Sequence, residues 1–76
     1  MILTAKNKTD YGYFLVFDGY YDYEIHREHS ESLFTSSEKM EVGKNYVFKY
    51  WGVWLLDFVE MDKEEEEKMF DEKEII

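Results

Sequence analysis

Apolar and polar residues alternate most regularly around Asp18-Gly19, which separates two runs of aromatic and β-branched residues. An Asp-Gly pair accepts the positive φ angles of a type I′ two-residue turn, which joins antiparallel strands. The second run alternates three apolar with three polar residues: Tyr21, Tyr23 and Ile25 against Asp22, Glu24 and His26. Period-2 alternation predicts a half-buried strand, so we expect a β-hairpin with one acidic, solvent-facing side.

Two strand segments precede this turn. Residues 11–17 are apolar on both faces, as in a strand covered on two sides. Residues 2–8 form an earlier strand that is joined through the turn-favouring pair Thr9-Asp10. With the second arm of the hairpin, these segments predict a three-stranded meander.

The remaining chain up to residue 61 contains a polar connector and one long apolar run. Residues 29–41 are rich in serine and charge, and Ser30 can cap a short helical turn there, or the segment is a loop. As one strand, residues 46–61 would span roughly 53 Å at about 3.3 Å per residue, too long for a small domain. We expect a break at Gly52, between strands at 46–50 and 53–60.

The element order over residues 2–61 resembles an OB-fold, a small five-stranded barrel with a linker or helix between its third and fourth strands. The resemblance rests on element order, and other five-stranded barrels or a curled sheet also fit. The sequence thus predicts a mainly β protein with a small OB-like or similar barrel over residues 1–61.

Residues 62–76 form an acidic tail with eight acidic and three basic residues. Asp62 and Glu65 have the spacing of a capping box, and the segment lacks glycine and proline, which predicts a helix at 63–76. Because a lone helix of this length is marginal in water, docking of its apolar stripe on the barrel would stabilise it. We therefore expect a helix that packs against the barrel or projects from it, or else a solvated tail. The stripe consists of Met69, Phe70, Lys73 and Ile76.

Composition narrows the classes of function. The 76 residues carry a formal net charge of -9 and include no cysteine, which excludes disulfides, thiolate metal sites and cysteine nucleophiles. A 20% aromatic share suits a ring-rich core. No stretch reads as a signal peptide or membrane helix, so we expect a cytoplasmic protein, in the host cytoplasm if it is viral.

No motif predicts catalysis, a cofactor or a metal. His26 and His29 form an H-x-x-H, but on a strand this spacing points the two rings to opposite faces, so we expect surface histidines. Asp22 and Glu24 could share acid and base roles, yet nothing indicates a pocket that would shift their pKa values. The chain has no glycine-rich phosphate loop either, and we predict that it is not an enzyme.

The acidic excess predicts a protein-binding module, because a negative field repels phosphate and attracts basic surfaces. Carboxylates on a rigid scaffold can mimic phosphates and occupy the basic surface of a nuclease or another nucleic-acid-handling protein. In size, acidity and lack of chemistry the chain resembles the small viral inhibitors that include anti-restriction and anti-CRISPR proteins. Alternatively, the charge only keeps the protein soluble. The predicted partner-binding residues are Asp22, Glu24, Glu28, Glu31, Trp51, Glu64, Glu65, Glu66 and Glu67.

A second interpretation is an OB-fold protein that binds single-stranded nucleic acid and recruits partners through its acidic tail. Tyr20, Trp51 and Trp54 would then be stacking platforms for bases. The tail resembles the acidic tails of some phage and bacterial single-stranded-DNA-binding proteins. Residues 1–61 carry ten acidic and six unclustered basic residues, which gives no positive track for a phosphate backbone. We therefore expect most of the aromatic rings to lie in the core.

Overall fold

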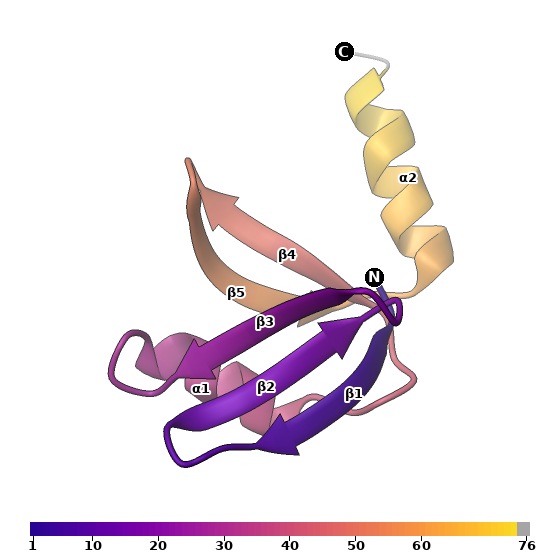
Figure 1. Cartoon of the computed structure of the whole chain (residues 1–76). Coiled ribbons are helices and arrows are strands. Elements are labelled where there is room, and N and C mark those ends of the chain that lie inside the picture. The colour runs from indigo at the N-terminus through magenta and orange to yellow at the C-terminus, as the bar shows by residue number, and fades with distance from the viewer. Residues whose placement is uncertain (75–76) are drawn as a thin grey trace.

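The computed structural model of the protein describes the backbone of residues 1–74 and the side chains of residues 1–68. Over this range the elements are β1 (Leu3–Lys8), β2 (Gly12–Phe17), β3 (Tyr21–His26), α1 (Glu31–Lys39), β4 (Tyr46–Trp51), β5 (Trp54–Glu60) and α2 (Lys63–Glu74). The strands form two antiparallel sheets, a meander of β1, β2 and β3 and a separate β4–β5 hairpin (Figure 1). The mainly β fold class is thus confirmed.

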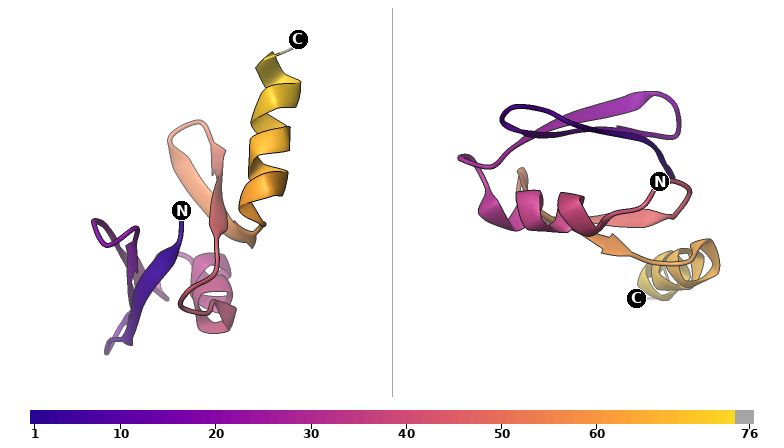
Figure 2. Two further views of the ribbon diagram at one scale, coloured as in Figure 1. Left: turned by 90° about the vertical axis from the view of Figure 1, so that its right-hand side faces the viewer. Right: turned by 90° about the horizontal axis from the view of Figure 1, so that it is seen from below.

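The body has two layers. The three-stranded sheet forms one layer, and α1 with the β4–β5 hairpin forms the other (Figure 2). Apolar side chains from both layers meet between them, which is where burial stabilises so small a domain most. The buried hydrophobic residues are Leu3, Tyr13, Leu15, Phe17, Ile25, Met40, Tyr46 and Phe58.

The prediction of a five-stranded barrel is wrong. In the described part of the chain, the segment leading into β1 meets the start of β4 only over a short stretch, through the Ile2–Asn45 bridge and the hydrogen bonds between Met1 and Tyr46, and β3 does not pair with β5. Beyond that bridge the β4–β5 hairpin continues away from the meander (Figure 1). Helix α1 packs against β5, β3 and β2, so a helix lies where strand pairing would have closed a barrel.

Strand β2 lies at the centre of the meander. It was predicted to be covered on both faces, but only one face is buried. Its inward residues Tyr13 and Phe17 are buried, but Phe14 and Val16 on the outer face are only half-buried. No second layer covers that outer face in the described part of the chain (Figure 2). At Gly12 an added Cβ would stand 2.0 Å from the carbonyl oxygen of Ile25, so the strand pairing leaves no room for a side chain there.

The turn after β2 forms at the predicted pair but is one residue longer than predicted. Asp18 and Gly19 have φ angles of 55° and 69°, the sign that a type I′ turn requires. Phe17 pairs with Tyr21, which leaves Tyr20 as a third loop residue. The extra residue turns the Tyr20 side chain into solvent, where it is 80% exposed.

The serine-rich connector forms a true helix, which resolves the earlier choice between helical turn and loop. The Ser30 hydroxyl oxygen accepts a hydrogen bond from the Leu33 N–H at 3.2 Å and caps the start of α1. At the other end, the Lys6 ammonium donates to the carbonyls of Glu38 and Met40, each at 2.9 Å. A cation at a helix C-terminus also favours the helix dipole, so β1 and α1 are joined at this point.

Helix α2 was predicted at 63–76, and its described part, Lys63–Glu74, extends away from both layers instead of lying across a sheet (Figures 1 and 2). The predicted docking stripe falls outside the described side chains. Among residues 1–68 no side-chain hydrogen bond from Asp62 caps the helix; its carbonyl accepts from the Glu66 N–H at 2.9 Å. Neither helix within residues 1–74 has the length and apolar character needed to cross a membrane.

Candidate functional site

The end of the β4–β5 hairpin is an exposed apolar surface, which we call the aromatic tip (Trp51, Val53 and Trp54). Gly52, at a φ of 61°, and Val53 form the turn, and Trp51 pairs with Trp54 across it. The exposed fractions of the three tip side chains are 73%, 90% and 70%. Because tryptophan and tyrosine are enriched among the residues that dominate binding energy, such a cluster is a candidate anchor for a partner.

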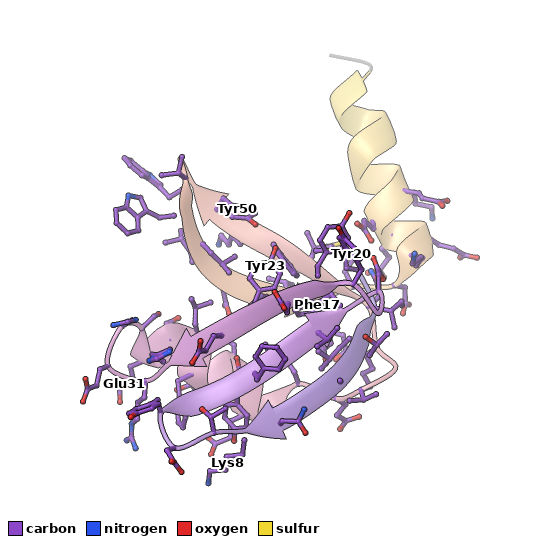
Figure 3. The ribbon with its side chains drawn as sticks, in the orientation of Figure 1. Lys8, Phe17, Tyr20, Tyr23, Glu31 and Tyr50 are labelled. Carbon is purple, nitrogen blue, oxygen red and sulfur yellow. The ribbon has the colours of Figure 1, made fainter. Side chains whose placement is uncertain are left out.

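The aromatic tip stands on a packed aromatic cluster. The ring of Phe48 lies 4.8 Å from that of Phe17 and 5.2 Å from that of Tyr23, centroid to centroid. Tyr50 continues the cluster towards the tip (Figure 3). Partial burial, reinforced by Tyr50, raises the pKa of the Tyr23 hydroxyl. The hairpin is therefore held to the core through Phe48.

The first turns of α2 present an acidic surface, which we call the acidic turn (Glu64–Glu67). Glu64, Glu65 and Glu67 are exposed, whereas Glu66 is half-buried. The Glu66 carboxylate accepts a 2.8 Å hydrogen bond from the Asn45 side-chain amide, which also donates to the Met61 carbonyl at 2.7 Å. Since Asn45 is buried at the start of β4, this link fixes the beginning of α2 to the body.

The other predicted acidic residues form a separate group. Asp22 and Glu24 are exposed on the outer face of β3, Glu28 lies in the following turn, and Glu31 begins α1. Figure 3 shows Glu31 at the end of the body far from α2. The structure thus divides the predicted acidic residues between two regions. The residues of the aromatic tip are not adjacent in sequence to either group.

The two histidines are stacked, so the prediction that their rings point to opposite faces is wrong. β3 ends at His26, and the turn that follows brings the His29 ring to 4.9 Å from the His26 ring. Tyr11 stacks on the other side of His26 at 5.5 Å, and Glu24 lies 2.9 Å from the His26 Nε2 atom. Within residues 1–68 no group of three potential ligands is arranged to hold a metal ion.

A hollow of about 160 Å³ lies beside this stack, lined by Asp10, Tyr11, His26, Arg27 and Glu28. Its lining mixes both charge signs with aromatic rings, and the Arg27 guanidinium lies over the Phe34 ring at 5.2 Å. These lining residues include no serine, threonine, cysteine or lysine side chain.

One basic side chain near the hairpin is already engaged with acids. Lys44, at the base of the hairpin, lies 3.2 Å from Glu60 and 3.4 Å from Glu41, and hydrogen bonding to Glu60, reinforced by Glu41, raises the pKa of its ammonium group. Lys49 lies opposite Asp57 in the strand register, but the Asp57 carboxylate accepts its hydrogen bonds from the Ser36 hydroxyl and the Phe58 N–H. Over residues 1–68, therefore, no contiguous lysine and arginine strip runs beside the exposed tryptophans.

Comparison with known proteins adds nothing to these observations. No protein-family model matches the chain, and no curated protein or solved structure matches it.

Sequence reasoning missed three features of this surface. Trp54 was considered only as a base-stacking platform, and its pairing with Trp51 was not foreseen because the predicted break ended the fourth strand at residue 50. The Asn45–Glu66 hydrogen bond joins residues 21 positions apart, and neither residue belongs to a motif. The only sequence signal for Asn45 was its position, as a polar residue directly before a predicted strand.

Proposed function

We propose that the protein is a small acidic binding module that docks on a basic surface of a larger, nucleic-acid-handling protein and inhibits it by occupying that surface. The acidic turn pairs with lysine and arginine side chains of the partner, and the aromatic tip supplies the apolar anchor. In this role the protein belongs to the same functional class as anti-restriction and anti-CRISPR inhibitors. It acts in the cytoplasm and catalyses no reaction.

One observation carries the proposal: α2, which begins with the acidic turn, and the β4–β5 hairpin, which ends in the aromatic tip, extend from the same side of the body (Figure 1). Charge complementarity raises association rates and selects partners, whereas buried aromatic residues supply most of the binding energy. The Asn45–Glu66 hydrogen bond supports the proposal because it limits the conformational entropy that binding would otherwise cost.

The proposal is tested by affinity capture with the intact protein and a Trp51→Ser/Trp54→Ser variant. Wild-type protein is expected to retain a basic nucleic-acid-handling protein, and an oligonucleotide is expected to compete for it. The double variant is expected to retain at least about tenfold less, because two anchors are lost. Its melting temperature is expected to stay nearly unchanged, since both rings are largely exposed.

The matched control is Tyr11→Ser/Tyr20→Ser, which removes two equally exposed rings from outside the aromatic tip. Retention by the control should equal that of the wild type. Equal retention by the tryptophan variant and the wild type would remove the aromatic tip from the function. Failure of the wild type to retain any basic protein would contradict the proposed function as a whole.

A second function, binding of single-stranded nucleic acid, is favoured by the exposure of Trp51 and Trp54, since exposed rings are the stacking platforms that such proteins use. The ion pairs of Lys44 with Glu60 and Glu41 weigh against it, because phosphate contacts provide most of the affinity of such proteins.

A further inference from the structure

Strand β4 has an open backbone edge beyond Tyr46. On the side away from β5, the Tyr46 N–H donates to the Met1 carbonyl at 2.8 Å, and the Met1 ammonium donates to the Tyr46 carbonyl at 2.9 Å. Because alternate residues of an antiparallel strand direct their N–H and C=O groups to the same side, Phe48 and Tyr50 direct theirs to this edge. Within the described part of the chain, neither backbone makes a hydrogen bond there.

A groove of about 220 Å³ runs along this edge. It is lined by Met1, Tyr46, Val47, Phe48, Tyr50 and Glu66. Both views of Figure 2 show the hairpin between the three-stranded sheet and α2, so an added strand would have the aromatic cluster on one face and α2 on the other. Exposed edges with unpaired N–H and C=O groups are the sites at which proteins accept a further strand.

We propose that this groove receives an extended basic segment of the partner protein, which adds to β4 as an antiparallel strand; this inference rests on the proposed function. Met1 already shows the arrangement on a small scale. It exchanges both hydrogen bonds with Tyr46, and its side chain packs against the core. The segment continues that pairing opposite Phe48 and Tyr50.

The pairing determines which residues the segment carries. Residues directly opposite each other in an antiparallel ladder place their side chains on the same face. Residues opposite Phe48 and Tyr50 are therefore apolar and face the aromatic cluster, where Tyr23 lies beside Phe48. The residues between them face α2, whose acidic turn selects lysine or arginine. The occupant thus alternates apolar and basic residues.

The test uses the intact protein and a peptide of about nine residues that alternates lysine and valine, a length typical of a strand. One derivative carries N-methyl groups on its valine nitrogens and another carries the same number on its lysine nitrogens. Composition and charge are equal, but only the valine amides face β4. Valine methylation is expected to weaken binding about tenfold or more, and lysine methylation less than about threefold. Backbone amide shifts of Phe48 and Tyr50 in NMR spectra report the position.

Equal affinity of both methylated peptides would overturn strand addition while leaving an acidic protein-binding surface intact. Binding that leaves the Phe48 and Tyr50 amides unshifted, or no binding of the unmethylated peptide, would also overturn it. Replacement of the peptide's lysines by glutamates is expected to abolish binding, and unaltered affinity would contradict the basic character of the occupant. Failure of the proposed function is detected separately, by the wild-type affinity capture.

Discussion

Replacement of Phe17 with alanine is expected to destabilise the protein by about 3–5 kcal/mol, the usual cost of removing a fully buried ring. The Phe17 side chain has no exposed surface, and its ring contacts those of Tyr23, Phe48 and Phe58. It therefore joins the meander to the β4–β5 hairpin. A domain of 76 residues has a total stability of roughly 4–11 kcal/mol, so the loss is a large fraction of it.

Urea denaturation followed by circular dichroism measures this change. The matched control is Phe14→Ala, which removes the same side chain from the half-buried outer face of the same strand. We expect the control to lose about 1 kcal/mol. Equal losses in the two variants would mean that the interface between the two layers does not hold the fold together.

Charge reversal in the acidic turn is expected to have the largest effect on function. Glu64→Lys with Glu67→Lys should weaken binding of the captured partner about hundredfold at low salt, since close charge pairs across interfaces contribute several kcal/mol. Each reversal adds two charges, so the net charge changes from -9 to -5. Both side chains are exposed and Glu66 keeps its bond to Asn45, so the fold is expected to remain intact.

The control for charge reversal is Asp10→Lys with Glu38→Lys, which gives the same net charge from exposed positions outside α2. Isothermal titration at two salt concentrations separates the outcomes, because added salt screens exposed charge pairs. The control should bind within about threefold of the wild type. A similar loss in both variants would show that overall charge, and not the acidic turn, attracts the partner.

The individual strands, turns and helices can be predicted from short sequence patterns. How these elements pack together cannot be predicted in the same way. The Asp18-Gly19 turn, the Ser30 cap and the break at Gly52 each depend on residues within a few positions of one another. Closure of a barrel depends on distant segments. Within the described residues, only the segment before β1 reaches the start of β4, through the Met1–Tyr46 hydrogen bonds and the Ile2–Asn45 bridge, and α1 packs where closure would have required a strand pair.

The candidate site was partly predictable for a similar reason. Exposure of Glu64, Glu65 and Glu67 follows from the cost of burying an unpaired charge. Exposure of Trp51 and Trp54 does not follow from the sequence, because aromatic rings in a small domain usually pack in its core. Their exposure results from the hairpin extending beyond the meander.

A rigid acidic scaffold is expected to attract cationic protein and to repel phosphate. Titration of the intact protein with a single-stranded oligonucleotide at low salt tests it directly, with the fluorescence of Trp51 and Trp54 as the readout. Both rings are exposed, so a stacked base would quench them. We expect no saturable quenching. Saturable quenching that is lost when Trp51 or Trp54 is replaced would contradict this expectation and identify a nucleic-acid-binding protein.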